Sequence, residues 1–284
     1  MTIDQVETFG NCLLQHGPAS DRVYLMKLDR EDFPEILDHL DELAESRGYS
    51  KVFAKVPAYA REGFEQDNYR LEAAIPGFYN GKTDGLFMAR YFDTERAIDP
   101  DAERVDEVLN AAQEKALAVP AIKAETRGDC RLAVPEDCAQ MAELYREVFA
   151  SYPFPVHDPD YLAETMAENV TYAGIWENGR LLALASAERD KAGSNAEMTD
   201  FATHPEFRGR GLANLLLWKL EELMAAVNCK TCYTIARATS FGMNITFAKN
   251  GYSFAGTLIK NTQISGGLES MNVWYKRLPG GANS

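Results

Sequence analysis

The stretch Arg208-Gly209-Arg210-Gly211-Leu212-Ala213 decides the fold because of the elements that flank it. The segment before it, Ala196–Thr203 (AEMTDFAT), has the pattern of a strand. After it, apolar residues recur at helical spacing from Leu212 to Val227, which predicts an amphipathic helix that begins inside the motif. Glycines let a backbone approach a ligand closely, and the N–H groups and dipole of a helix N-terminus attract negative charge. The two arginines add formal charge, so the expected ligand is a phosphate or pyrophosphate.

The motif alone does not identify a phosphate site, because an ordinary loop with solvated arginines would have the same letters. Two other phosphate-binding motifs fit the chain less well. The sequence has no Gly-x-x-x-x-Gly-Lys-Ser/Thr, and Gly209-x-Gly211 lacks the third glycine of a dinucleotide-binding fingerprint. The interpretation therefore depends on the surrounding elements and on those that follow.

The downstream elements come in a characteristic order. A strand is predicted at Thr231–Arg237, then a short helix that ends in Gly251-Tyr252, then strands at Phe254–Gln263 and Met271–Leu278. This order resembles the GCN5-related N-acetyltransferase (GNAT) superfamily, whose phosphate loop has the pattern Gln/Arg-x-x-Gly-x-Gly/Ala. The resemblance covers about residues 128–278. It implies an α/β (α+β) fold, a mixed and mostly antiparallel twisted sheet flanked by helices, with acetyl-CoA as cosubstrate and no metal.

Three runs point to one group within this superfamily. They are THPEFRGRGLANLLL (203–217), ARATSFGMNITFAKNGY (236–252) and GGLESMNVWYKRL (266–278), and they are similar to the β-lysine N-acetyltransferases. Those enzymes acetylate the ε-amine of β-lysine to form the osmolyte Nε-acetyl-β-lysine. The alternatives are transfer to another amine (a polyamine, an aminoglycoside or a protein N-terminus) and a non-catalytic acyl-CoA sensor.

Acetyl transfer to an amine requires a base, because a lysine-type ammonium has a pKa of about 10.4. A carboxylate beside the amine can accept its proton. Glu197 matches the position that holds the general base in several members of the superfamily, and Asp200 is the alternative base or an anchor for the substrate ammonium. With the two-residue period of a strand, these side chains point to opposite faces unless a bulge intervenes. The resemblance implies such a bulge, which opens the strand for the pantetheine arm.

The resemblance also implies how the coenzyme is held. Backbone groups of Phe201, Ala202 and Thr203 would bind the pantetheine amides, and backbone amides from Arg208 to Ala213 would bind the pyrophosphate. On the later helix, many members have an asparagine and, further along, a tyrosine that acts as general acid. Those positions are Ser240 and Phe247 here, and a phenylalanine cannot donate a proton.

This departure leaves the proton donor open. Either the thiolate, with a pKa of about 8.5, leaves without an acid, or a hydroxyl such as Ser240, Tyr233 or Tyr252 supplies the proton. Asn244, on the same helix, is a candidate to replace the missing asparagine contact.

Several side chains are candidates for the acceptor site. Arg237, Lys249 and Lys260 could bind the substrate carboxylate, and Asp200 and Glu269 could bind its distal ammonium. The proline-rich segment Ser151–Asp160 lies over the acceptor site in this superfamily. The resemblance therefore makes three residues of this segment candidates for the substrate pocket: Tyr152, Phe154 and His157.

Composition limits the class of partner. The chain has 284 residues with 43 acidic and 29 basic side chains, a net charge of −14, which argues against a nucleic-acid partner. No apolar run approaches membrane-spanning length, so we expect a cytoplasmic protein that acts on a small-molecule amine, and a homodimer is compatible with the sequence. Five cysteines include Cys229-Lys-Thr-Cys232, but no second pair completes a zinc site, which favours a structural role.

Two domains are predicted, residues 1–125 and residues 128–278. The first has an internal likeness to the second, because residues 51–75 and residues 234–258 share a strand, a short helix with phenylalanine, an Asn/Gly-Tyr ending and a second strand. No glycine loop stands between the first strand and helix of the N-terminal half; LDREDFP occupies that place and would repel phosphate. This half is either a degenerate half-acetyltransferase or an ordinary strand–helix–strand unit.

Overall fold

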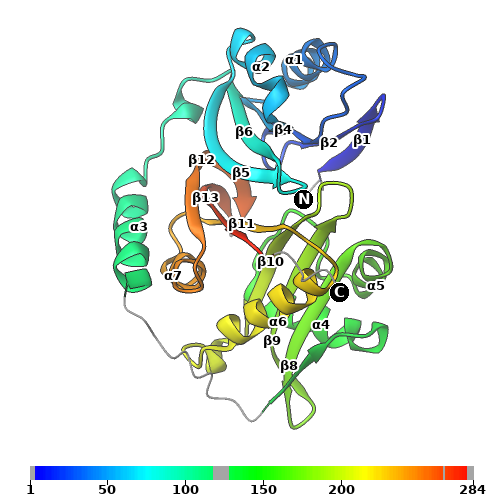
Figure 1. Cartoon of the computed structure of the whole chain (residues 1–284), viewed down its shortest axis with the longest axis vertical. Helices are drawn as coiled ribbons and strands as arrows, with labels where there is room; N and C mark the ends of the chain where they lie inside the picture. The colour runs from blue at the N-terminus through cyan, green and yellow to red at the C-terminus, as the bar shows by residue number, and fades with distance from the viewer. Residues whose placement is uncertain (1–3, 118–127, 265, 280–284) are drawn as a thin grey trace.

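One continuous sheet of 13 strands runs through both halves of the chain (Figure 1). The computed structural model describes residues 4–117, 128–264 and 266–279. The strands lie in the order β1-β2-β3-β4-β6-β5-β12-β13-β11-β10-β9-β8-β7. The pairs β3–β4 and β10–β11 are parallel and the rest are antiparallel, so the predicted mixed, mostly antiparallel sheet is confirmed.

The N-terminal half contributes six strands and two α-helices, after which a third helix follows. Their bounds are β1 (Gln5–Phe9), β2 (Cys12–Gly17), β3 (Arg22–Lys27), α1 (Ile36–Arg47), β4 (Lys51–Pro57), α2 (Arg61–Gln66), β5 (Arg70–Tyr79), β6 (Thr83–Tyr91) and α3 (Ala102–Leu117). The C-terminal half consists of β7 (Asp129–Leu132), α4 (Cys138–Val148), α5 (Pro159–Glu168), β8 (Val170–Glu177), β9 (Arg180–Asp190), β10 (Asn195–Thr203), α6 (Leu212–Ala226), β11 (Thr231–Arg237), α7 (Phe241–Lys249), β12 (Ser253–Ile264) and β13 (Gly267–Arg277).

The two halves repeat one connectivity. In the N-terminal half, β3 is parallel to β4, β4 pairs with β6, and β6 pairs with β5, with α1 and α2 as the connections. In the C-terminal half, β10 is parallel to β11, β11 pairs with β13, and β13 pairs with β12, with α6 and α7 as the connections. The internal likeness predicted for residues 51–75 and 234–258 therefore extends to strand order and direction.

The helices cover both faces of the C-terminal part of the sheet. Successive side chains of β8 enter different cores, because Ala173 and Ile175 pack in the core that includes α6 whereas Tyr172 packs in the core that includes α4 and α5. A further apolar core joins the two halves, with Tyr24 and Phe53 from one half against Tyr233 and Leu258 from the other.

The halves meet where β5 pairs with β12. This pairing is a single bridge between Ala73 and Gly256. Beyond it, the register of β12 against β13 shifts between Leu258 and Thr262, and residues 259–261 leave the ladder. Each carbonyl of this bulge accepts a hydrogen bond from a buried cation of the N-terminal half: Ile259 from Lys51 Nζ at 2.7 Å, Lys260 from Arg96 Nε at 2.9 Å, and Asn261 from Arg22.

The predicted elements of the C-terminal half are confirmed with shifts of a few residues at their ends. The strands β1, β2 and β6 were not predicted. The predicted domain boundary between residues 125 and 128 falls on residues 118–127, which lie outside the described part. Helix α3, predicted to belong to the N-terminal domain, packs against α7 of the other half (Figure 1), with Arg104 over the ring of Phe241 at 4.3 Å.

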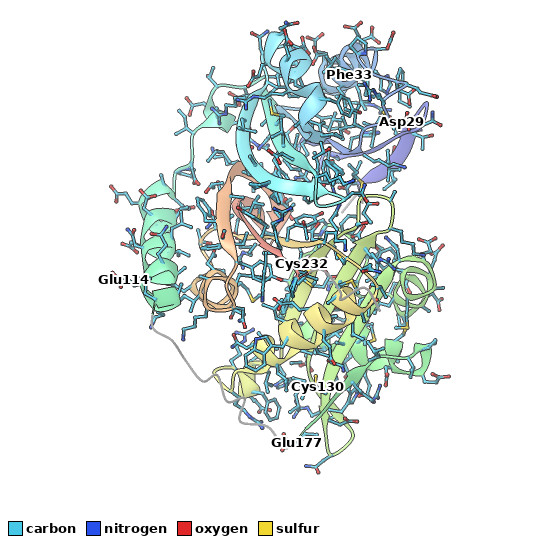
Figure 2. All side chains as sticks on the ribbon, in the orientation of Figure 1. Asp29, Phe33, Glu114, Cys130, Glu177 and Cys232 are labelled. Carbon is cyan, nitrogen blue, oxygen red and sulfur yellow. The ribbon has the colours of Figure 1, made fainter. Side chains whose placement is uncertain are left out.

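All five cysteines are free, in line with the structural role predicted for Cys229 and Cys232. Cys229 is buried between α6 and β11, and Cys232 is buried on β11, where Figure 2 labels it near the centre of the molecule. The Cys229 thiol donates toward the carbonyl of Ser194.

Replacement of Gly256 by alanine should destabilise the junction. A Cβ at this position would lie 2.0 Å from the carbonyl oxygen of Glu72, and the φ of +148° is unfavourable for a side chain. We expect a loss of about 2–4 kcal/mol in the free energy of unfolding, measured by urea denaturation. The matched control is Gly48→Ala, at a φ of +70° with no atom within 4 Å of the new Cβ, for which we expect about 1 kcal/mol. Equal losses in the two variants would contradict the close approach.

Candidate active site

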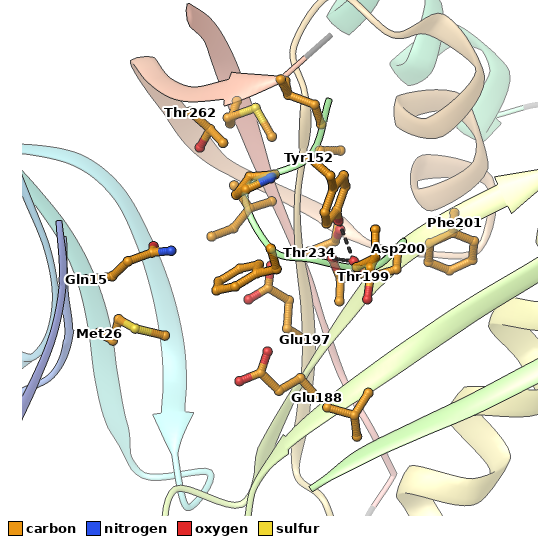
Figure 3. Close-up of a pocket in the computed structure, with 18 of the residues that line it drawn as sticks. Gln15, Met26, Tyr152, Glu188, Glu197, Thr199, Asp200, Phe201, Thr234 and Thr262 are labelled. Carbon is orange, nitrogen blue, oxygen red and sulfur yellow. Dashed lines mark hydrogen bonds between the residues drawn. The ribbon is translucent and has the colours of Figure 1, made fainter. Parts of the chain in front are cut away.

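A cavity of about 670 Å³ opens between the two halves of the molecule. Its C-terminal wall is formed by the sheet strands β8–β13, by α5 and the segment before it, and by α7. Its N-terminal wall comes from β1–β4. Figure 3 shows Glu188 and Glu197 on one side, with Gln15 and Met26 on the facing strands of the other half. The principal polar and aromatic lining residues are Gln15, Arg22, Tyr24, Lys55, Tyr152, Glu188, Glu197, Thr199, Asp200, Arg237, Ser240 and Phe247.

Strand β10 has the bulge that the resemblance to the GNAT superfamily implied. Its register against β9 shifts between Thr199 and Ala202, and Asp200 has a φ of +53°. Because of this shift, Glu197 and Asp200 both line the cavity despite their three-residue spacing. The ladder between β10 and β11 joins Asn195–Glu197 to Thr231–Tyr233, whereas β10 continues to Thr203 and β11 to Arg237. The two strands therefore separate directly after Glu197.

Glu197 lies at the point where these strands separate. It stands opposite Glu188 on β9 and beside Tyr233 on β11. Burial raises the pKa of Glu197 to about 7, and the charges of Glu188 and Asp200 add to this rise, while Lys55 and a hydrogen bond from Tyr233 oppose it. A carboxylate with a pKa near neutrality is suited to accept and release a proton.

Lys55 brings a positive charge to this carboxylate from the N-terminal half. Its Nζ donates to the Tyr233 hydroxyl at 3.1 Å, and the side chain lines the cavity between the two halves. Burial alone would lower the pKa of Lys55, but Tyr233, Tyr24 and Glu197 raise it well above its ordinary value. Lys55 is therefore protonated at neutral pH and stabilises the anionic form of Glu197.

Asp200 is held more tightly by its surroundings. Its carboxylate accepts hydrogen bonds from the hydroxyl of Ser186 at 2.6 Å and from the hydroxyl of Tyr152 (Figure 3). Burial raises the pKa of Asp200, whereas these hydrogen bonds lower it. One of these hydrogen bonds fixes the bulge to β9 and the other fixes it to the segment before α5, so Asp200 has less freedom than Glu197 to exchange a proton.

The glycine-rich motif has the geometry expected of an anion site. Gly209 and Gly211 have φ values of +80° and +75°, and α6 begins at Leu212 with Gly211 as its N-cap residue. The N–H groups of a first helical turn have no partner within the helix. Arg208 donates to the carbonyl of Thr203, and Arg210 pairs with Glu177, the last residue of β8, which is labelled in Figure 2.

Helix α7 places Phe247 and Ser240 in the cavity wall, but not Asn244. The Asn244 side chain is fully buried, where it donates to the carbonyls of Arg237 and Ser240 and accepts from Asn272 and Trp274. All of its hydrogen-bonding capacity is used inside the protein. Asn244 therefore ties α7 to the sheet, and its side chain has no hydrogen-bonding group left over for the predicted coenzyme contact.

The three hydroxyls considered as proton donors occupy different places. Ser240 lines the cavity at the N-terminus of α7. Tyr252 is buried against Phe247, and Tyr233 lies behind Glu197 and Lys55. Neither tyrosine is among the residues that line the cavity.

The predicted acceptor-site charges are mostly engaged elsewhere. Arg237 lines the cavity but forms a two-fold ion pair with Glu269, which also accepts from Thr239. Glu269, which was predicted to bind the substrate ammonium, is outside the cavity lining, and its charge neutralises Arg237. Lys249 and Lys260 are also outside the lining, and Lys260 donates to the carbonyl of Glu95.

Of the residues predicted in the proline-rich segment, Tyr152 and Phe154 line the cavity and His157 does not. Residues from the other half were missed: Gln15, Arg22, Tyr24, Lys55, and also Glu188 of β9. A signal for some of them was present, since Lys51, Phe53 and Lys55 alternate with the apolar Val52, Ala54 and Val56. In the described residues, no group of histidine, cysteine and carboxylate side chains is arranged to hold a metal ion.

None of the helices in the described part of the chain is long and apolar enough to cross a membrane.

Comparison with known proteins agrees with this geometry. Residues 139–252 match the Acetyltransferase (GNAT) family. The chain is 37% identical to the β-lysine N(6)-acetyltransferase of Methanococcus maripaludis over 96% of this chain and 99% of the relative. It is 32% identical to the N-acetyltransferase YodP of Bacillus subtilis (94% and 96%) and 32% identical to the β-lysine N(6)-acetyltransferase of Methanosarcina mazei (87% and 98%).

These relatives match the N-terminal half as well as the GNAT segment, because the aligned regions cover nearly the whole of each chain. The chain therefore belongs to the GNAT family of acetyl-CoA-dependent N-acetyltransferases, in the group of full-length relatives that includes the β-lysine N(6)-acetyltransferases.

Proposed function

We propose that this enzyme transfers an acetyl group from acetyl-CoA to the ε-amine of β-lysine, forming Nε-acetyl-β-lysine. The observation that carries the proposal is the 37% identity to a β-lysine N(6)-acetyltransferase along almost the whole of both chains. That length matters because the acceptor cavity is built by both halves. A similarity confined to the GNAT segment would leave the N-terminal wall of the cavity unaccounted for.

The coenzyme would lie along the opening between β10 and β11. The free strand edge after Glu197 suits Phe201, Ala202 and Thr203 for hydrogen bonds to an extended amide-containing chain. The loop Arg208–Gly211 and the first turn of α6, with Leu212 and Ala213, suit a pyrophosphate. When bound, acetyl-CoA supplies an activated thioester carbonyl carbon for attack by the amine.

Glu197 is the proposed general base. Deprotonation of a lysine-type ammonium at pH 7 costs about 4.6 kcal/mol, and a carboxylate in contact with the amine can take the proton as the C–N bond forms. The C–S bond breaks and the sulfur takes up a proton to leave as a thiol. Ser240 is the proposed donor for that proton, because it lines the cavity on α7 where Phe247 replaces the usual tyrosine.

We also propose that the N-terminal half is a degenerate half-GNAT unit. The shared strand order and directions of β3-β4-β6-β5 and β10-β11-β13-β12 support this. Five free cysteines fit a reducing compartment, which supports a cytoplasmic enzyme. A homodimer remains a prediction.

The substrate is tested with a panel of amines. β-Lysine, α-lysine, spermidine and an aminoglycoside are each offered with acetyl-CoA, and release of coenzyme A is followed while mass spectrometry locates the acetyl group. We expect β-lysine to be preferred and acetylated at its ε-amine, because a site that pairs buried charges rejects analogues that leave one unpaired. Faster turnover of spermidine, which has no carboxylate, would contradict β-lysine as substrate but not the acetyltransferase activity.

Glu197→Gln should lower kcat by about 10²–10⁴-fold at pH 7, because the amide cannot accept the proton. The loss should shrink at high pH, where the amine deprotonates without help. Calorimetric titration with acetyl-CoA serves as the control, and its affinity should stay near that of the wild type. Wild-type turnover at pH 7 would assign the base to another group, of which Asp200 is the nearest alternative on β10.

Lys55→Met should move the acidic limb of the kcat/KM pH profile to higher pH by about 1–3 units. The Lys55 cation lowers the pKa of Glu197, so its removal lets that pKa rise above about 7 and the base form is reached only at higher pH. Lys55→Arg is the matched control, because it keeps the cation and should keep the profile. If the methionine and wild-type profiles coincide, Lys55 does not act through Glu197.

A further inference from the structure

Arg22 has an unusual environment in the N-terminal wall of the cavity. Its side chain is 5% exposed and lines the cavity. One terminal nitrogen donates to the carbonyl of Asn261 and to the hydroxyl of Thr262 at 3.2 Å. The guanidinium carbon lies 5.1 Å from the centre of the Tyr24 ring and 5.6 Å from that of Phe53. The guanidinium plane is thus fixed by one nitrogen and two rings.

No carboxylate among the described residues lies within 4.0 Å of the Arg22 nitrogens, and its Nε is buried without a hydrogen-bond partner. Burial lowers the pKa of Arg22 to about 10, and Asp4 opposes this from beyond contact distance. A buried guanidinium without a carboxylate is costly, since a desolvated charge is stabilised only by an opposite charge or a full set of hydrogen bonds.

The neighbouring buried cations of the same junction differ in this respect. Lys51 pairs with Glu72 at 2.9 Å, and Arg96 pairs with Asp21 at 3.0 Å. Both also donate to carbonyls of the β12 bulge, as Arg22 does, but neither lines the cavity. Within this set, the cation that faces the cavity is the one without a carboxylate.

We propose that Arg22 binds the carboxylate of the amino-acid substrate, so that the N-terminal half determines which amines are accepted. A guanidinium with free N–H groups is matched to a carboxylate by its planar fork of donors. This assignment rests on the proposed function, which requires an acceptor with one carboxylate and two amines. It also supplies the carboxylate site that Arg237 cannot offer while it is paired with Glu269.

The position of Arg22 relative to the base suits such a substrate. Arg22 and Glu197 line the same cavity, and Tyr24 is close to both groups. The centre of its ring lies 5.1 Å from the guanidinium carbon of Arg22, and its pKa, which burial raises, is also affected by the charges of Lys55 and Glu197. The ε-nitrogen and the carboxylate of β-lysine are the two ends of the molecule, separated by six bonds, or roughly 7–8 Å when extended. A substrate anchored at Arg22 can therefore reach along the cavity toward Glu197 with its ε-amine.

The test compares β-lysine with 1,4-diaminopentane, the same diamine without its carboxylate. Steady-state kinetics are measured for both amines at saturating acetyl-CoA. We expect the wild type to prefer β-lysine. Arg22→Gln should lower kcat/KM for β-lysine by about 10²–10³-fold and that for 1,4-diaminopentane by less than about threefold. Arg22→Lys keeps the charge but loses the planar fork of donors. Its kcat/KM for β-lysine should lie between those of the wild type and Arg22→Gln.

The matched control is Arg96→Gln, which removes a buried guanidinium from the same bulge but from outside the cavity. It should change kcat/KM for the two amines by the same factor, because it affects only the stability of the protein. Thermal melting and acetyl-CoA affinity are recorded for each variant, and Arg22→Lys carries the test if Arg22→Gln does not fold.

Two failures are distinguishable. A wild type that prefers 1,4-diaminopentane would overturn the proposed function and the Arg22 assignment with it. The Arg22 assignment alone would be overturned if the wild type prefers β-lysine but the Arg22 variants do not behave as expected. That is the case if they lose activity toward both amines equally, or if they keep full activity toward β-lysine.

Discussion

The site depends on how three carbonyl groups of β12 are satisfied. Residues 259–261 leave the ladder with β13, and their carbonyls are turned toward the N-terminal half, where Lys51, Arg96 and Arg22 donate to them. A buried carbonyl without a donor and a buried cation without an acceptor are both costly. Each group therefore satisfies the other when the two halves are in one relative orientation. The single bridge between β5 and β12 would not fix that orientation by itself.

This orientation creates a cavity with an unequal distribution of charge. The C-terminal half lines it with five carboxylates and with Arg237, which is paired with Glu269; the carboxylates are Glu164, Glu168, Glu188, Glu197 and Asp200. The N-terminal half lines it with Lys55 and Arg22. Asp200 accepts hydrogen bonds from Tyr152 and Ser186, and Tyr233 contacts both Glu197 and Lys55. The lining carboxylates that remain exposed are Glu164, Glu168 and Glu188. A ligand with ammonium groups and one carboxylate complements this arrangement. The acyl-transfer machinery and the groups that distinguish one amine from another thus come from different parts of the chain.

Features formed by neighbouring residues could be predicted from the sequence. Features that depend on the contact between the two halves could be predicted less well. The strand–loop–helix around Gly211 and the bulge before Ala202 are local features, and both were predicted. Lys55 was missed because its strand alternates polar and apolar residues, a pattern that ordinarily marks a solvent-facing side. In the structure, that side is covered by the C-terminal half. Glu269 was predicted as a substrate group because the sequence does not reveal its partner. Only the pairing of β11 with β13 brings it to Arg237.

A second unit of similar topology can serve one active site without a coenzyme loop of its own. The acidic side chains of LDREDFP, which follows β3, would repel a phosphate at the N-terminus of α1. This half is therefore unsuited to bind a nucleotide there. What the topology retains is a sheet whose edge strand β5 meets β12 and whose strands β3 and β4 face Glu197. Alternation along those strands puts Val23, Val52 and Ala54 into the core of their own half. The same alternation leaves Arg22, Tyr24 and Lys55 for the cavity, where changes in side chain can alter amine selectivity without touching the coenzyme loop.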